Sequence, residues 1–210
     1  MKTVIVCNGS INDYEYHKRF FLGADLVIAA DGGANHLEKM NIKPDILLGD
    51  FDSFSSSNLA NYKEQGIEVI QFPAEKDMTD SELAINIAIE RGCNQIVLLG
   101  ATGSRLDHTM ANIFMLKMML DKGIEGWIAN ENNQITLIKD RLDIKKKDDI
   151  NITLLALTQV TGVTIEGFYY PLDDVTLEVG STWGVSNKLI ADKGVVTIKS
   201  GLLYVMLTKD

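Results

Sequence analysis

The sequence predicts a mixed α/β plus all-β fold, in which an α/β part comes first and an all-β part follows. Over about the first 125 residues, short apolar runs alternate with stretches of helical periodicity, the pattern of βαβ units and of a mostly parallel sheet. After residue 125 the helical periodicity stops, and short β-rich runs between turn-like clusters predict a small sandwich or barrel. We therefore expect two domains, residues 1–125 and 126–210, with the boundary at residues 125–140.

The strands expected in the first domain are short, apolar and rich in β-branched residues. They cover residues 3–7, 26–30, 46–48, 67–72 and 96–99. Residues 81–91 repeat apolar side chains at helical spacing, and Thr79 with Glu82 three residues later forms a capping box at the start of this helix. Residues 108–122 show the same helical spacing and stop before Gly123.

The second domain is expected to consist of strands alone. They cover residues 126–129, 134–138, 150–157, 163–165, 175–179, 195–198 and 202–207. Charged clusters between them, such as residues 146–149, have the composition of turns.

Composition limits the kinds of partner. The net charge of −9 argues against nucleic acid and fits a cationic or metal-complexed small ligand. Cys7 and Cys93 lack metal-ligand spacing, so we expect buried free thiols in a reducing cytoplasm. No apolar run approaches the ~20 residues of a membrane span, and Met1 leads straight into a strand without a signal-peptide pattern. We expect a cytoplasmic protein with no membrane contact.

Four acidic motifs follow apolar runs or their short loops in the first domain. They are Asp31-Gly32-Gly33, Gly49-Asp50-Phe51-Asp52-Ser53, Asp77-Met78-Thr79-Asp80 and Arg105-Leu106-Asp107-His108. Ligands of open α/β sheets bind at the carboxyl ends of the strands, so we expect these carboxylates around one crevice. Carboxylates repel one another and polyphosphate, and the oxygen ligands of Asp suit Mg²⁺. The motifs therefore predict metal-assisted chemistry on a nucleotide.

The pair Asp50 and Asp52 is the sharpest metal candidate. Two residues apart at a strand end, the two carboxylates point the same way, while Phe51 faces the opposite side, toward packing. Such a pair favours a bound divalent cation. The alternative is a solvated turn in which Ser53 caps the next helix.

The remaining motifs are weaker taken singly. The glycines of Asp31-Gly32-Gly33 allow backbone amides to approach a phosphate or ribose, but an ordinary strand-to-helix turn explains them as well. Asp77 and Asp80 flank a helix start, where the helix dipole favours Asp without any function. Lys76 is the nearest cation for a phosphate in that segment.

A loop rich in small residues, 100–108, follows the strand expected at residues 96–99. It matches neither the P-loop nor the dinucleotide-binding pattern, but its amides and Arg105 can still cradle phosphates. The alternative is an ion pair of Arg105 with Asp107 that only fixes the loop. His108 is better explained as a helix-start residue than as a base.

Two loops of the second domain combine polar and aromatic residues. They are residues 181–187, with the sequence STWGVSN, and the pair Tyr169-Tyr170. Exposed loops of this type often recognise ligands, although ordinary hairpin turns are the simpler explanation.

Taken in order, these motifs resemble those of the thiamine pyrophosphokinase family. The matching segments are ADGGAN (30–35), PDILLGDFDS (44–53), KDMTDSELA (76–84), LLGATGSRLDHTMAN (98–112) and GVSNKL (184–189). The resemblance spans nearly the whole chain and implies a Rossmann-like α/β domain, a C-terminal β-sandwich that binds thiamine, and a homodimer with active sites between subunits. It also implies a Mg²⁺-dependent transfer of the pyrophosphoryl group of ATP to the thiamine hydroxyl, which gives thiamine diphosphate and AMP.

The resemblance assigns roles to individual residues. Asp50, Asp52 and Asp80 resemble the Mg²⁺ ligands, and Asp107 and Arg105 complete the catalytic set. The residues expected near ATP are Asp31, Gly32, Gly33, Lys76, Asp77, Thr79, Thr102, Ser104 and Arg105. Tyr170, Ser186 and Asn187 resemble the thiamine-binding residues. Two positions depart from the family pattern, because Lys76 stands where some members carry Gln and Tyr170 replaces a tryptophan.

Physical chemistry agrees with this assignment. Thiamine is an aromatic cation, which suits an acidic protein with aromatic loops. Asp80 or Asp107 is a candidate acceptor for the proton of the thiamine hydroxyl. Two rival functions stay open, a pyrophosphokinase acting on a pterin alcohol and a non-catalytic nucleotide or thiamine sensor. A dehydrogenase is disfavoured because the dinucleotide fingerprint is missing.

Overall fold

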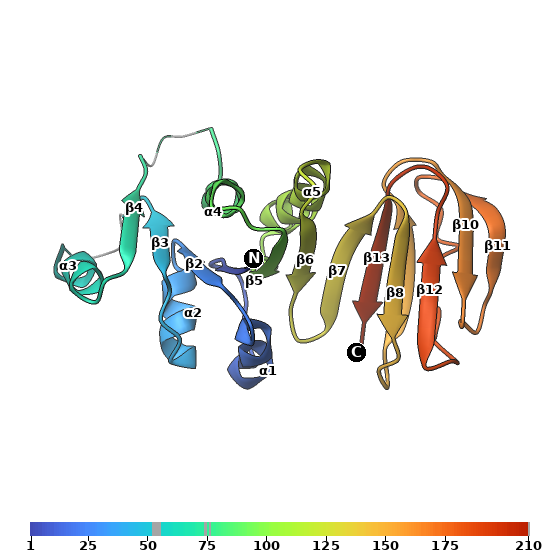
Figure 1. The fold of residues 1–210 in the computed structure, drawn as a ribbon, viewed down its shortest axis with the longest axis horizontal. Helices are drawn as coiled ribbons and strands as arrows, with labels where there is room; N and C mark the ends of the chain where they lie inside the picture. Colours follow the sequence, from blue (N-terminus) through green and yellow to red (C-terminus); the bar gives the residue numbers. More distant parts are fainter. Residues whose placement is uncertain (52–55, 74, 76, 210) are drawn as a thin grey trace. The chain divides into compact units, whose positions relative to one another are not determined.

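The computed structural model describes residues 1–51, 56–73, 75 and 77–209, and it divides into two compact units, Met1–Glu131 and Asn132–Asp210. The first unit carries the parallel strands and the helices, and in the described residues the second unit is built from strands and turns (Figure 1). The predicted fold class, an α/β part followed by an all-β part, is confirmed.

The first unit is built on a parallel sheet. Its strands are β1 (Lys2–Val6), β2 (Leu26–Ala30), β3 (Ile46–Gly49), β4 (Glu68–Gln71), β5 (Gln95–Leu99) and β6 (Glu125–Ala129). They lie in the order β4-β3-β2-β1-β5-β6, and each neighbouring pair is parallel. The chain builds outward from β1 to β4 and then returns to place β5 beside β1. The strand order therefore reverses between β1 and β5, the point at which open α/β sheets bind their ligands.

Helices cover both faces of this sheet. They are α1 (Tyr14–Lys18), the 3-10 turn η1 (Arg19–Phe21), α2 (Gly33–Met40), α3 (Ser56–Glu64), α4 (Asp80–Glu90) and α5 (Leu106–Asp121). Figure 1 shows α1 and α2 on one face and α4 and α5 on the other. Val4 and Val6 pack with Leu37 of α2 in one apolar cluster, and Ile5 and Ile28 are buried as well. Because both of their faces are buried, the central strands β1, β2, β3 and β5 are nearly continuous apolar runs in the sequence.

Local sequence signals set the helix ends. Thr79 Oγ1 accepts a hydrogen bond of 3.2 Å from the backbone N–H of Glu82, so the predicted N-cap of α4 is confirmed. At the start of α2, a Cβ on Gly33 would lie only 1.9 Å from the carbonyl oxygen of Val6, and glycine lets the helix pack closely against β1. Among the described residues no helix has the length and apolar character needed to cross a bilayer.

The second unit consists of two antiparallel sheets. Its strands are β7 (Asn133–Ile138), β8 (Arg141–Lys145), β9 (Asn151–Ala156), β10 (Val160–Glu166), β11 (Leu172–Leu177), β12 (Lys193–Thr197) and β13 (Leu203–Thr208). One sheet has the order β7-β13-β9 and the other β11-β10-β12-β8, with all pairs antiparallel. The sequence pattern did not predict β8, because this edge strand buries Ile144 alone and otherwise carries charged or partly exposed residues.

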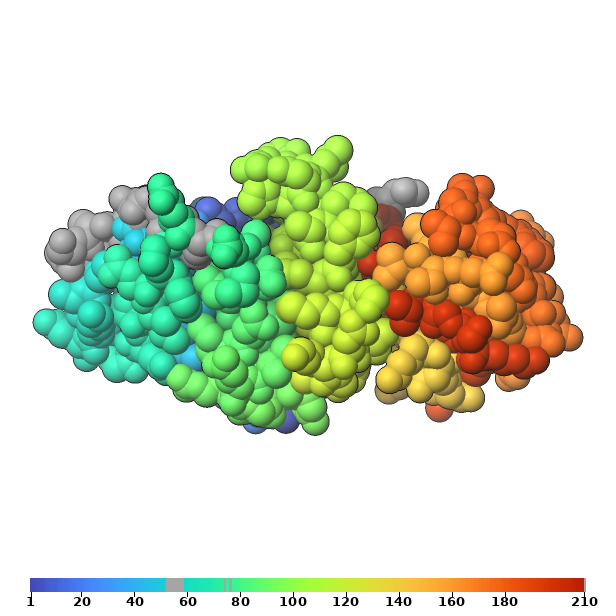
Figure 2. Space-filling view, turned by 90° about the horizontal axis from the view of Figure 1, so that it is seen from above, coloured from blue at the N-terminus to red at the C-terminus, as the bar shows by residue number. Residues whose placement is uncertain are grey.

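Helix α5 offers a direct test of the core. Leu116 is 1% exposed and packs over Gly126 of β6, whereas Leu106, in the first turn of the same helix, is 74% exposed. In Figure 2 the lime-green segment that includes the start of α5 protrudes at the upper edge of the view. Leu116→Ala should lower the free energy of unfolding by about 2–5 kcal/mol, because it leaves a cavity. Leu106→Ala should change it by no more than about 0.5 kcal/mol.

Urea titrations followed by circular dichroism measure both variants. The packing assigned to α5 would be wrong if the two substitutions cost the same.

Candidate functional site

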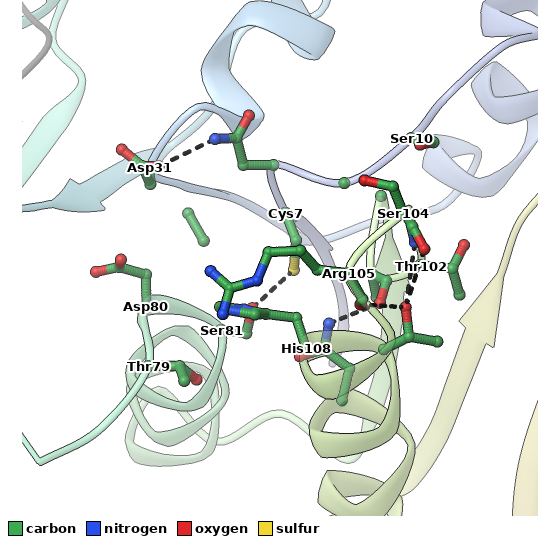
Figure 3. A pocket seen from close by; sticks show the side chains of 18 residues that line it. Cys7, Ser10, Asp31, Thr79, Asp80, Ser81, Thr102, Ser104, Arg105 and His108 are labelled. Carbon is green, nitrogen blue, oxygen red and sulfur yellow. Dashed lines mark hydrogen bonds between the residues drawn. The ribbon is translucent and has the colours of Figure 1, made fainter.

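A pocket of about 510 Å³ opens in the first unit at the carboxyl ends of β1, β2 and β5. Its walls come from the loop after β1, residues 30–31 at the end of β2, the start of α4, the loop after β5 and the first turns of α5 (Figure 3). This volume lies in the range of small-molecule sites, and the pocket sits where the strand order reverses. The sequence predicted a crevice at the carboxyl ends of the strands, and the pocket lies there.

Two glycine-containing loops form the floor of the pocket by direct contact between their backbones. The N–H of Gly9 donates to the carbonyl of Gly100 at 2.7 Å, and the N–H of Ser10 donates to the carbonyl of Thr102 at 2.7 Å. A Cβ on Gly9 would lie 2.3 Å from the Gly100 oxygen, and a Cβ on Gly100, whose φ is +60°, would lie 2.4 Å from the oxygen of Cys7. Only residues without a side chain allow this approach.

A histidine braces the first of these loops from α2. His36 Nε2 lies 2.8 Å from the carbonyl oxygen of Gly9, and its Nδ1 lies 3.1 Å from the Tyr14 hydroxyl. Burial lowers the pKa of His36, so the ring is neutral at physiological pH. Nε2 therefore carries the proton and donates to Gly9, and Nδ1 accepts from Tyr14.

The acidic side of the pocket is formed by Asp31 and Asp80. Asp31 follows β2 with a left-handed backbone, φ +50°, and its carboxylate accepts a hydrogen bond of 3.2 Å from Asn8. Asp80 is the first residue of α4, and both side chains lie on the same side of the pocket in Figure 3. Asp50 follows the neighbouring strand β3, but it does not line the pocket.

The prediction for Asp50 and Asp52 assumed strand geometry that continues beyond the end of β3, and the backbone departs from it at Phe51. β3 stops at Gly49, and Phe51 has a left-handed backbone with φ +60°. The expectation that Phe51 packs inward is confirmed, because it is buried in the apolar cluster. Asp52 lies outside the described residues, and so does Lys76.

The donor chemistry fits a hard cation such as Mg²⁺. Asp31, Asp50 and Asp80 offer carboxylate oxygens at the carboxyl edge of the sheet, and among the described lining residues Arg105 is the one permanently charged cation. Within the described residues no three acidic, histidine or cysteine side chains form a group that could hold a metal ion. The predicted trio with Asp52 therefore stays a prediction.

Arg105 lies in the pocket and is held by Asp107 in the first turn of α5. Its Nε and Nη2 donate to the two carboxylate oxygens at 3.2 and 2.6 Å, so the ion pair weighed from the sequence is present. The hydrogen bonds from Arg105 hold the pKa of Asp107 down to about 2. Both side chains are well exposed, and Figure 3 shows Arg105 extended into the pocket.

The structure brings together some of the predicted site residues and leaves others outside. Those that line the pocket are Asp31, Thr79, Asp80, Thr102, Ser104 and Arg105. Asp50, Asp77 and Asp107 do not line it. Gly32 and Gly33 do not line it either, and their close contacts are with Asn8 and Val6, which gives them a packing role.

Sequence reasoning missed the loop of residues 7–10 and the helix side chains that support the other loop. Asn112 of α5 is buried and donates to the carbonyl of Ala101 at 2.6 Å, and Thr109 Oγ1 accepts from the N–H of Gly103 at 3.2 Å. His108 lies in the first turn of α5, as predicted, and also lines the pocket. The available signal was Asn8-Gly9-Ser10, a run of small turn residues directly after the first strand.

Of the three residues predicted to bind thiamine, Tyr170 and Asn187 contact each other in the second unit. Tyr170 N–H donates to Asn187 Oδ1 at 3.1 Å, and Asn187 Nδ2 donates to the Tyr170 carbonyl at 2.7 Å. Ser186 has a left-handed backbone, φ +60°, and its N–H donates to Thr153 Oγ1 at 3.1 Å. The rings of Tyr169 and Tyr170 meet edge to face with centroids 4.8 Å apart, and both are exposed.

Comparison with known proteins gives matches on both units. The family model described as "Thiamin pyrophosphokinase, catalytic domain" matches residues 17–128, and the model "Thiamin pyrophosphokinase, vitamin B1 binding domain" matches residues 139–203. The thiamine pyrophosphokinase of Bacillus subtilis (strain 168) is 30% identical over 188 residues, which cover 88% of this chain and 88% of that protein.

Solved structures agree over the full length. The crystal structure of thiamine pyrophosphokinase from Bacillus subtilis matches with a TM-score of 0.88 at 28% identity and covers 100% of both chains. That of thiamin pyrophosphokinase from Geobacillus thermodenitrificans matches with a TM-score of 0.85 at 29% identity, covering 100% of this chain and 98% of the other.

The thiol of Cys7 at the pocket floor should be unreactive. It is buried, accepts a hydrogen bond of 3.3 Å from the Ser81 hydroxyl, and burial raises its pKa to about 11. Because the thiolate is the reactive form, a Cys93→Ala variant should react slowly with a disulfide reagent at about pH 8 and faster as the pH rises. Unfolding in guanidinium should expose the Cys7 thiol, which should then react at once. Fast stoichiometric reaction of the native protein would contradict this assignment.

Proposed function

Because this chain belongs to the thiamine pyrophosphokinase family of enzymes, we propose that it transfers the pyrophosphoryl group of ATP to the hydroxyl of thiamine, releasing thiamine diphosphate and AMP. The observation that carries the proposal is the match of a catalytic-domain model to the first unit and of a vitamin B1 binding model to the second. The pocket at the strand reversal of the first unit is the proposed ATP site.

The pocket has features that suit a polyphosphate. The loops of residues 7–10 and 100–105 line it, and Gly9, Gly100 and Gly103 leave parts of these two loops without side chains. Arg105 presents a planar guanidinium that can bind phosphate oxygens in place of the Asp107 carboxylate. We assign to Arg105 the stabilisation of phosphate charge, and to Asp107 the orientation of Arg105 before ATP arrives.

We propose that Asp50, Asp52 and Asp80 hold Mg²⁺. When bound, the ion would neutralise negative charge on the ATP phosphates. The carboxylates of Asp31, Asp50 and Asp80 at the carboxyl edge of the sheet support this assignment, because carboxylates and polyphosphate repel one another without a shared cation. Of the two candidate acceptors for the thiamine proton, Asp80 lines the pocket and Asp107 does not. Asp80 is therefore the proposed acceptor.

The second unit supplies the proposed thiamine contacts. Tyr170 presents an exposed aromatic ring, on which a cationic heterocycle can stack. Ser186 directly precedes Asn187, whose side chain bonds the backbone of Tyr170. We also propose a homodimer in the cytoplasm with active sites between subunits, as the family resemblance implies.

Phosphorus NMR of the purified protein with thiamine, ATP and Mg²⁺ tests the reaction. Thiamine diphosphate with an equal amount of AMP is the expected result. ADP with thiamine monophosphate would overturn the transfer of a pyrophosphoryl group. If thiamine binds but no product forms, the protein is a thiamine sensor and not an enzyme. If only a pterin alcohol is converted, the substrate is that alcohol and not thiamine.

Substitution of Asp80 tests the acidic side of the pocket. Asp80→Asn removes a charge at the proposed metal and proton site and should lower kcat by at least about 100-fold. Glu90→Gln, at the exposed far end of the same helix, is the matched control and should leave kcat within about twofold. Both variants should keep the wild-type circular dichroism spectrum. An Asp80→Asn enzyme with wild-type kcat would remove Asp80 from the mechanism.

Subunit complementation tests the shared active site. A heterodimer is purified through two different tags, with Asp80→Asn in one copy and Tyr170→Ala with Ser186→Ala in the other. One of its two sites then combines intact halves, so about half of the wild-type activity is expected. Each variant homodimer is the control. A heterodimer as inactive as its parents would place the whole site within one subunit.

A further inference from the structure

Asn187 belongs to the pair of residues predicted to bind thiamine, but its side chain is turned inward. It is 7% exposed, while the neighbouring Ser186 is exposed. Its backbone pairs with Ile152 of β9 in both directions, with N–H to oxygen distances of 2.8 and 2.7 Å. The residue is therefore a fixed part of the second unit before any ligand is present.

The amide group of Asn187 makes three hydrogen bonds within the protein. Oδ1 accepts from the N–H groups of Tyr170 at 3.1 Å and Lys188 at 2.8 Å, and Nδ2 donates to the carbonyl of Tyr170 at 2.7 Å. Both lone pairs of the amide oxygen are thus used. Rotation toward a ligand would leave the N–H and the C=O of Tyr170 without these partners.

This amide group works as a peptide mimic. Residues 168–169 pair with 188–189 through backbone atoms, since Tyr169 N–H donates to the Lys188 carbonyl at 2.8 Å and Phe168 forms a bridge with Leu189. At Tyr170 the Asn187 side chain takes the place of a paired backbone, because it hydrogen-bonds both the N–H and the C=O group of Tyr170. The pairing is extended by one residue, up to the residue that carries the exposed ring.

We propose that Asn187 is a positioning residue, which holds the backbone of Tyr170 so that its ring is presented to thiamine, and that it does not contact thiamine itself. This inference rests on the proposed function, because it takes the ring of Tyr170 as the thiamine contact. Tyr170 is 62% exposed, and its ring contacts the ring of Tyr169 edge to face, so the backbone hydrogen bonds to Asn187 are a main restraint on its position. Ser186 is the member of the pair left to touch the substrate.

A double-mutant cycle on thiamine binding separates positioning from contact. Asn187→Ala and Tyr170→Ala are made singly and together, and the KM values for thiamine and ATP are measured with kcat. A stacked cation contributes about 0.5–2 kcal/mol, so each single variant should raise the KM for thiamine by about 2–30-fold, with the KM for ATP within about twofold of wild type. In the Tyr170→Ala background, Asn187→Ala should have no further effect beyond about twofold.

The charge of thiamine gives a second, independent readout. Asn187→Asp keeps the size of the side chain but replaces the donor to the Tyr170 carbonyl by a repelling oxygen. If Asn187 only positions Tyr170, this variant binds thiamine as weakly as Asn187→Ala. If Asn187 touched the cationic substrate, the new carboxylate would strengthen binding and overturn the proposal.

A control variant accounts for loss of stability in the second unit. Thr161→Val removes the hydroxyl pair with Ser200, 2.7 Å apart at the opposite end of β10, and should leave the KM for thiamine within about twofold while lowering the melting temperature. Equal penalties of Asn187→Ala with and without the Tyr170 ring would overturn the proposal. Failure of the wild-type protein to bind or convert thiamine would instead overturn the proposed function, and the wild-type measurement reports this separately.

Discussion

The site of the first unit depends on a contact between two backbones. β1 and β5 are neighbours in the sheet, so the loops that follow them leave it about 4.8 Å apart. Gly9 and Gly100 let these loops meet through hydrogen bonds without side chains between them. The direction of the second loop then sets where α5 begins, and with it the place of Arg105. A side chain at either glycine would push apart the two loops that form the pocket floor.

Charge is the second constraint on this pocket. The chain carries a net charge of −9, and carboxylates follow β2 and β3 and begin α4. The guanidinium of Arg105 is already engaged by Asp107 in the structure. If the pocket binds ATP as proposed, the polyphosphate meets more negative than positive charge there, which favours binding as a complex with a divalent cation. Hydrogen bonds between the two loops fix the shape of the pocket, and its charge would then select the form in which a polyphosphate binds.

The sequence was informative where the cause of a structure is local. The N-cap of α4 needs only Thr79 and the N–H of Glu82, and the buried strands are visible as apolar runs. It failed where the cause is distant in the chain. Gly9 has a role because Gly100 lies against it, and Asn112 is buried because it supports Ala101. The left-handed Phe51, which ends the strand geometry expected for Asp50, has no signature in its neighbours.

The second unit shows how an exposed aromatic ring can be held without being buried. A free tyrosine side chain on a surface loop would lose backbone and side-chain freedom on binding a ligand, and this loss weakens affinity. In this protein the backbone of Tyr170 has already lost that conformational freedom on folding, because Asn187 bonds both its N–H and its C=O group. Asparagine suits this task, since its short side chain offers an acceptor and a donor in one plane. Aspartate lacks the donor, and glutamine would place the amide one methylene further out. The chemistry of the surface at Tyr170 therefore depends on a polar side chain that is itself almost hidden from solvent.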